Sequence, residues 1–359
     1  MITDRSFDFL ERLLDAPGPS GFEVEPARVW RAEAETIAER VEVDVSGNSI
    51  AVLNPGGSPR VMLAGHVDEI GVIVTHVDED GYLYIDGIGG WDSQVLVGQR
   101  IRLLGRSGPV PGVIGKKPIH LMKPDERDKV SKMTDLWIDV GAADRAEVLE
   151  MGIRVGDPGV IDATMVRLGK KLIASRAIDN RIGAYVVLEA LRLVADDRSE
   201  LAAEVTAVAT TQEEIAYHGG GARTSAYRLD PEVALVVDVT FATDAPQSEK
   251  KQTGEHKLGS GPVLTRGSAV HPLVFQRLAD TADAAAIPYT IHAAARATWT
   301  DADAIHLSRR GVATGLVSVP NRYMHSPNEI VSLDDLDGAA RLIARFCLGL
   351  TSDTDFTQT

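Results

Sequence analysis

The chain has 359 residues, of which 44% are apolar and 25% are charged, a composition typical of globular proteins with about two domains at this length. Its 52 acidic residues outnumber its 37 basic ones, and the resulting net charge of −15 argues against a nucleic-acid-binding protein. No secretory leader and no apolar run of about 18 residues is present, and the single cysteine, Cys347, lies in an apolar, core-like pattern. We therefore expect a cytoplasmic protein without a membrane span or an internal disulfide.

The first 70 residues predict a helix, a short hairpin and a buried strand. The start, MITDRSFDFLERLLDA, is amphipathic, and the alternating stretch VEVDVSGNSIAVLNPG is broken by Ser-Gly-Asn, which indicates a hairpin turn. From about residue 72 to residue 163 the sequence changes to short alternating strands with Gly and Pro turns, beginning with a hairpin around Asp80-Gly81. This pattern predicts a small β-barrel or sandwich.

From about residue 165 onward, helical and strand-like segments alternate. NRIGAYVVLEALRLVADD predicts a helix, LAAEVTAVATT and PEVALVVDVT predict strands, and LDDLDGAARLIARFCLGL predicts a final helix. Such alternation is typical of an α/β fold with a doubly wound, mainly parallel sheet sandwiched by helices. The sequence thus predicts a discontinuous α/β domain at 1–71 and 164–359, an inserted β-barrel-like domain at 72–163, and a frayed polar tail.

Potential metal ligands occur in five segments, four of which place the polar residue directly after an apolar, strand-like run. Because ligands of open α/β sheets bind beyond the carboxyl ends of the strands, we expect these side chains to meet at one edge of the sheet. Imidazoles combined with carboxylates suit zinc, cobalt or manganese. We favour two metal ions that share a bridging carboxylate. The candidates are His66, Asp179, Glu213 or Glu214, Asp238 and His325.

Each candidate also has an ordinary structural explanation. Asp179 precedes an apolar helix, where an N-cap is the commoner role of Asp. Asp238 interrupts a buried strand, where an unpaired carboxylate costs several kcal/mol and therefore needs some partner. His325 lies in a loop, and loop histidines usually have no special role. Because ordinary roles would require several coincidences at strand ends, the combination predicts a metal site.

Two further acidic residues are candidates for catalysis. Asp68 lies two positions after His66, on the same side of an extended strand, so it can accept the proton of the imidazole nitrogen that does not hold metal. Glu213 and Glu214 are adjacent and have no basic neighbour in the sequence. One of them can bind metal while the other takes a proton from an attacking water.

The motifs around these residues resemble those of metallopeptidase family 42, the co-catalytic dinuclear aminopeptidases that include the glutamyl and tetrahedral aminopeptidases. The resemblance implies that His66 and Asp238 hold one metal ion, that Glu214 and His325 hold the other, and that Asp179 bridges them. Matching segments extend through most of the chain. They are AGHVDEIG, GYLYIDGIGGWD, VGQRI, GVIGKKPIH, LWIDVGA, SRAIDNRIGAYVVLEAL, TTQEE, VVDVT, LGSGPVLTRGS, TDADAI and SVPNRYMHSPNEIV.

The same resemblance implies Glu213 as general base, Asp68 as the residue that orients His66, and a cis peptide bond between Asp179 and Asn180. It also implies that the inserted β domain helps assembly and substrate access. Family members commonly build a hollow tetrahedral dodecamer from dimers, which would admit only peptides or unfolded chains. We therefore expect a homo-oligomer, either a dimer or a dodecamer.

One segment departs from the family pattern. The family usually follows the paired glutamates with a Gly and then an Arg-Gly, whereas this chain has EEIAYHGGG. Ala216 replaces the glycine and His218 replaces the arginine. Both glutamates are retained, so metal binding is expected to survive, but the loop beyond them and the substrate pocket are expected to differ.

The complete ligand set with a spare glutamate predicts a metal-dependent aminopeptidase with two divalent ions, zinc first and cobalt or manganese as alternatives. A water shared by the metals would attack the scissile carbonyl while Glu213 accepts its proton. A deacylase or carboxypeptidase is the alternative, and it would need a cation for a substrate carboxylate, such as Arg176, Arg181 or Arg322. A glycosidase, suggested by the endoglucanase label of many family members, would leave the histidines unexplained. A non-enzymatic assembly protein has only the altered loop in its favour.

Overall fold

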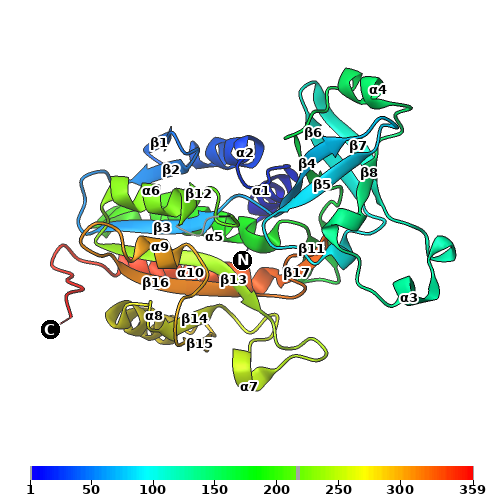
Figure 1. Cartoon of the computed structure of the whole chain (residues 1–359). Helices are drawn as coiled ribbons and strands as arrows, with labels where there is room; N and C mark the ends of the chain where they lie inside the picture. Colours follow the sequence, from blue (N-terminus) through cyan, green and yellow to red (C-terminus); the bar gives the residue numbers. More distant parts are fainter. Residues whose placement is uncertain (1, 216–218, 359) are drawn as a thin grey trace.

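The computed structural model describes residues 2–215 and 219–358, and it shows an α/β body beside a small β-barrel (Figure 1). Within these residues the body is built on one eight-stranded sheet, whose central strands run parallel to one another. This arrangement confirms the predicted doubly wound, mainly parallel sheet. In spatial order the strands are β1 (Arg40–Val43), β2 (Ser49–Leu53), β12 (Glu204–Thr210), β3 (Arg60–His66), β13 (Val233–Phe241), β16 (Ala313–Asn321), β14 (Val263–Gly267) and β15 (Thr290–Ala294).

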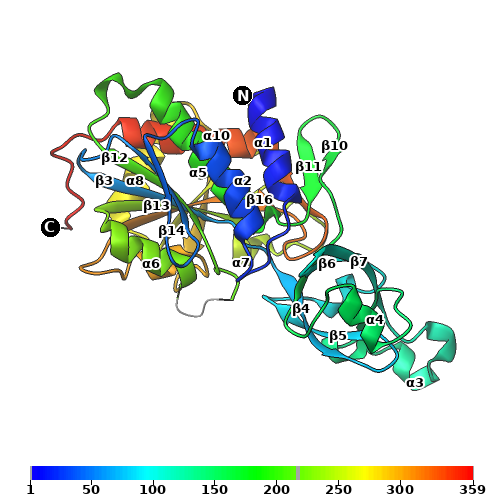
Figure 2. The same cartoon turned by 90° about the horizontal axis from the view of Figure 1, so that it is seen from above.

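Helices lie on both faces of this sheet (Figure 2). The most deeply buried helix packs on β3 and β13 and is apolar on nearly all sides, which is typical of a helix enclosed by other elements. This helix is α5 (Ile178–Asp196). α1 (Asp4–Asp15), α2 (Val24–Ala34) and α10 (Leu333–Leu348) pack against it, and α8 (Pro272–Ala284) packs against α10. The helices α6 (Gly220–Leu229) and α9 (Ala302–Ile305) contact each other and the strands of the sheet.

The chain leaves the sheet after β3 and forms a closed six-stranded barrel before it returns. The barrel has its own apolar core, in which Val72, Leu83, Leu103 and Ile138 are almost fully buried. Its first hairpin turns at Gly81, whose φ of 84° is a conformation that glycine adopts without strain. The strands, in barrel order, are β4 (Gly71–Val77), β5 (Leu83–Ile88), β8 (Trp137–Asp139), β7 (Gly108–Gly115), β6 (Arg100–Gly105) and β9 (Pro158–Ile161).

The separate core supports a proposed division into an α/β domain (1–71 and 164–359) and an inserted domain (72–163). Short helices project from the inserted part, and a small three-stranded sheet joins the body near α5. No helix among the described residues is long and apolar enough to cross a membrane. The remaining elements are α3 (Pro124–Arg127), α4 (Arg145–Glu150), β10 (Val166–Leu168), β11 (Leu172–Ser175), α7 (Lys250–Thr253) and β17 (Glu329–Ser332).

One ordinary alternative is excluded, and one local prediction was wrong. Asp179 is not the N-cap of α5, because the helix begins at Ile178 and Asp179 follows it with non-helical backbone angles. The carboxyl-terminal tail is not uniformly exposed, because the ring of Phe356 is buried and stacks on Phe346, with ring centroids 6.4 Å apart. Cys347 is fully buried, as its apolar pattern predicted.

Candidate active site

The carboxyl ends of the central strands bring the predicted metal ligands together. His66 is the last residue of β3 and lies in register with Thr210, the last residue of β12. The paired glutamates follow β12 after two more residues, and Asp238 lies near the end of β13. His325 follows β16, and Asp179 comes from the start of α5. One edge of the sheet therefore collects all of these side chains.

Asp179 lies between the two histidines and offers one carboxylate oxygen to each. Its Oδ1 is 3.3 Å from His66 Nε2, and its Oδ2 is 3.4 Å from His325 Nε2. Glu213 Oε2 lies 3.6 Å from His66 Nε2, whereas Glu214 Oε2 lies 3.3 Å from His325 Nε2. The peptide bond between Asp179 and Asn180 is cis, as the resemblance implied.

Two groups of donor atoms among the described residues are compact enough to hold a metal ion. One group contains His66, Glu213 and Asp238, and the other contains His66, Asp179 and Glu214. Within each group the ligand atoms all lie within 4.8 Å of one another. Mixed imidazole and carboxylate donors at this spacing are typical of sites for zinc and similar divalent ions.

The electrostatics of the cluster also fit a cation. Burial, reinforced by the neighbouring Asp179 carboxylate, raises the pKa of Glu214 and of Asp238. Burial disfavours the charged imidazole of His325, but Asp179 and Glu214 outweigh it and raise its pKa to about 11. Glu214 Oε1 is buried without a hydrogen-bond partner among the described residues. The site therefore crowds buried carboxylates together and leaves a donor atom open, as a site for a divalent ion does.

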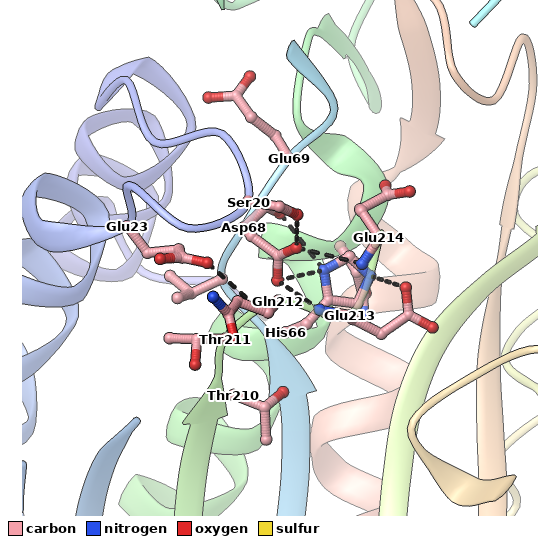
Figure 3. A network of polar contacts seen from close by, with 12 residues as sticks. Ser20, Glu23, His66, Asp68, Glu69, Thr210, Thr211, Gln212, Glu213 and Glu214 are labelled. Atoms are coloured by element: carbon pink, nitrogen blue, oxygen red, sulfur yellow. Dashed lines mark hydrogen bonds and ion pairs between the residues drawn. The ribbon is translucent and has the colours of Figure 1, made fainter. Parts of the chain in front are cut away.

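Asp68 organises both the histidine and the glutamate loop (Figure 3). Its Oδ1 lies 3.4 Å from His66 Nδ1 and accepts the Glu213 backbone N–H at 3.2 Å. Its Oδ2 accepts the Glu214 backbone N–H at 3.2 Å and the hydroxyl hydrogen of Ser20. The sequence suggested only the contact with His66, so the fixing of the paired glutamates is an additional role for this carboxylate.

Glu23 supports the same loop from the amino-terminal segment. Its Oε1 accepts the backbone N–H groups of Gly21 at 2.7 Å and of Gln212 at 3.1 Å. Burial raises the pKa of Glu23 to about 7. The motif PGPSGFE, which contains Ser20 and Glu23, carries no local pattern that would have indicated this contact.

Glu329 holds the backbones of two candidate ligands at once, and the sequence did not indicate this role. Its Oε2 accepts the Asp179 N–H and its Oε1 accepts the His325 N–H, each at 2.9 Å. The residue is buried at the start of β17, so water cannot readily replace these bonds. His325 has a φ of 59°, and the bond from Glu329 stabilises this left-handed backbone.

Glu329→Gln is expected to weaken metal retention by about 10- to 100-fold, the usual effect of losing a group that orients a metal ligand. The amide keeps the size of the side chain but turns an N–H donor toward one of the two backbone N–H groups. Chelator competition followed by metal analysis measures the loss. Glu11→Gln, an exposed change on α1, is the control and should leave metal retention unchanged. Equal retention in both variants would contradict the role.

The barrel reaches the cluster through a glycine turn after β5. The Gly90 carbonyl oxygen lies 2.8 Å from His325 Nδ1, the ring nitrogen that faces away from Asp179. A side chain at Gly90 would contact the same ring, since a Cβ there would lie 3.4 Å from Nδ1. The inserted part of the chain therefore contributes to the orientation of a candidate ligand.

A buried ion cluster lies next to the site. The Glu69 carboxylate accepts hydrogen bonds from Arg176 and, at 2.7 Å, from Arg181 Nη2. Arg181 is fully buried and also donates to backbone carbonyl groups at the end of α1, and Arg176 donates to the Asp15 carbonyl. The cluster ties the amino-terminal segment to β3 and α5, so neither arginine is free to bind a substrate.

A sequence model of the M42 glutamyl aminopeptidase family matches residues 47–342. The chain belongs to this family. It is 36% identical to the lysyl aminopeptidase of Pyrococcus furiosus over 98% of this chain and 99% of that one. The family assigns the chain to the peptide hydrolases.

Solved structures of M42 relatives share the whole fold. The TET aminopeptidase of the marine sediment archaeon Thaumarchaeota archaeon SCGC AB-539-E09 superposes with a TM-score of 0.92, at 36% identity over 97% of each chain. The TET1 peptidase of Pyrococcus horikoshii, which can assemble into a tetrahedron or a large octahedral shell, gives a TM-score of 0.84 at 30% identity over 96% of this chain and all of that one. Ala216 and His218, where the sequence departs from the M42 pattern, lie outside the described residues.

Proposed function

We propose that this M42 protein is a metal-dependent aminopeptidase that removes N-terminal residues from peptides. The observation that carries this proposal is the placement of Asp179 between His66 and His325, with Glu213 beside the first histidine. The family match supports an aminopeptidase, and the acidic cluster supports its dependence on metal.

We propose that the ligands are divided between two divalent ions. His66 and Asp238 would hold one ion, Glu214 and His325 would hold the other, and Asp179 would serve both. The contacts of Asp179 with both histidines and of Glu214 with His325 support this division. Zinc is our first choice because its sites combine imidazole and carboxylate donors, and cobalt and manganese accept the same donors. When bound, such ions would lower the pKa of an attacking water and polarise the scissile carbonyl.

Glu213 is proposed as the general base. Its carboxylate belongs to the donor group of His66 and Asp238, but 17% of the side chain is exposed, which supports a contact with substrate. It would accept the proton of the attacking water and return it to the leaving amine. Asp68 would hold the imidazole of His66 and the backbone of Glu213 in the geometry that this transfer needs.

A deacylase or carboxypeptidase would need a cation for a substrate carboxylate, and the three arginines considered for this role are all paired with acidic residues. Arg176 and Arg181 are buried against Glu69, and Arg322 pairs with Asp244 at 2.7 Å. None of these three arginines is therefore free to hold a substrate carboxylate, which favours an aminopeptidase.

We also propose that the chain forms a homo-oligomer, as the TET relatives do. The inserted barrel (72–163) is the proposed element for assembly and for control of substrate access. It suits this role because it has a separate core, projects from the body and contacts the candidate site at Gly90 (Figure 1).

Chelation is expected to abolish hydrolysis of aminoacyl-p-nitroanilides, and zinc, cobalt or manganese is expected to restore it. The metal would polarise the scissile carbonyl, and the carboxylates of the cluster cannot do this without it. Rates before chelation, after it and after each metal is added measure the effect, and an N-acetylated substrate is the control. Activity that survives complete metal removal, or cleavage of the N-acetylated substrate at the same rate, would contradict the proposal.

A further inference from the structure

Trp299 is an exposed aromatic residue in the cleft that leads to Glu213 and Glu214. The Trp299 residue is 87% exposed, and the cleft has a volume of about 1330 Å³. Other large apolar residues that are partly exposed line the same cleft. They are Ile215, Tyr227 and Leu307. Exposed apolar side chains that gather in one concave region mark a binding surface, in contrast to isolated ones.

The backbone holds Trp299 in a conformation that bulky residues rarely adopt. Its φ is 58°, in the left-handed region. The Asp303 carboxylate stabilises this turn, because it accepts the N–H groups of Thr298 and Trp299 at 2.9 and 2.8 Å and the Thr298 hydroxyl hydrogen at 2.8 Å. Strain that is held by a set of specific hydrogen bonds beside a catalytic site points to a functional role.

We propose that Trp299 is a specificity-determining residue that packs against a large apolar side chain on the N-terminal residue of the substrate. This inference rests on the proposed aminopeptidase function. When the amino end of the peptide lies at Glu213 and Glu214, the side chain of its first residue would extend into the cleft that these glutamates share with Trp299. Leucine, phenylalanine or methionine at this position would cover the exposed ring of Trp299, which a small side chain cannot do.

The charged groups of the cleft show which residue would act if the enzyme instead preferred acidic N-terminal residues. Arg309 lies over the Tyr227 ring, with its guanidinium carbon 4.2 Å from the ring centroid, and its Nε donates to the Tyr227 carbonyl. Asp303 is saturated by the turn at Trp299. Within the described lining, Arg223 is the cation without a protein partner, so a preference for acidic N-terminal residues would point to Arg223 instead.

The test is Trp299→Gly, because glycine adopts a positive φ without strain and an exposed ring leaves no cavity. We expect the metal-loaded wild type to favour phenylalanyl- and leucyl- over alanyl-p-nitroanilide in kcat/KM. The variant should lower this preference about tenfold, mainly through KM, and keep the alanyl substrate within about twofold. Val45→Ala removes part of an exposed apolar side chain outside the cleft and should change nothing. An unchanged preference, or a preference of the wild type for glutamyl substrates, would overturn the proposal.

A binding measurement separates this inference from the proposed function. Metal-loaded Glu213→Gln is titrated with Leu-Gly and with Gly-Gly while tryptophan emission is recorded. Leu-Gly should shift the emission, Gly-Gly should not, and the shift should disappear in the double variant with Trp299→Gly. Absence of hydrolysis in the wild type would overturn the aminopeptidase proposal alone. Equal emission changes with Leu-Gly in Glu213→Gln and in the double variant would overturn the role of Trp299.

Discussion

Glu213→Gln is expected to keep the bound metal ions while the rate of peptide hydrolysis falls at least about 100-fold, the lower range for loss of a general base. The amide has the same size as the carboxylate but cannot take a proton from water. The backbone bond from Glu213 to Asp68 does not involve the side chain, so the loop should keep its position. Metal analysis and kcat on a leucyl-p-nitroanilide substrate measure the two effects separately.

Glu214→Gln is the matched comparison, because it makes the same carboxylate-to-amide change at the adjacent residue. Its Oε2 lies 3.3 Å from His325 Nε2, so we expect this variant to lose metal as well as activity. Full activity in Glu213→Gln would remove Glu213 as the base. Loss of metal from Glu213→Gln would instead make Glu213 a ligand, together with His66 and Asp238.

Glu69→Ala is expected to lower the free energy of unfolding by about 3–5 kcal/mol, the usual effect of removing one partner from a buried ion pair. Glu69 is 2% exposed, and its removal leaves Arg176 and Arg181 buried without a counter-charge. It also frees the Gly18 N–H, which donates to Glu69 Oε1 at 3.1 Å. Urea unfolding of the metal-loaded protein, followed by circular dichroism, measures the change.

Glu25→Ala is the control for this stability effect. Glu25 pairs with Arg28 on the surface of α2, where both side chains are about half exposed or more. A pair of this kind contributes between about 0 and 1 kcal/mol, so the control should unfold almost as the wild type does. A loss below about 1 kcal/mol in Glu69→Ala would mean that water or a rearranged side chain neutralises the two arginines.

The parts of the fold that depend on residues close together in the sequence were predicted correctly. Alternating apolar residues around Asp80-Gly81 predicted the first barrel hairpin, and the buried run before His66 predicted the central strand β3. The end of the chain was mispredicted, because the burial of Phe356 depends on Phe346 in the folded body and not on the polar residues beside it.

The same distinction applies to the site. The candidate ligands lie at strand ends, which a single sequence reveals, so the structure finds His66, Asp238 and the paired glutamates at one edge of the sheet. Ser20 and Glu329 were missed because they act through contacts with residues far away in the chain. The Asp179 N–H that Glu329 accepts lies 150 positions away, and a contact over such a separation leaves no periodic pattern in the sequence.

The order of the strands has a consequence for synthesis of the protein. Strand β3, which carries His66, pairs with β12 and β13, and β12 begins about 140 positions later in the chain. At translation rates of about 5–20 residues per second, this apolar strand emerges from the ribosome roughly 7–28 s before either partner. The barrel that follows β3 has its own core and can form during this interval. We therefore expect β3 to be prone to aggregation in a newly made chain until β12 and β13 have emerged.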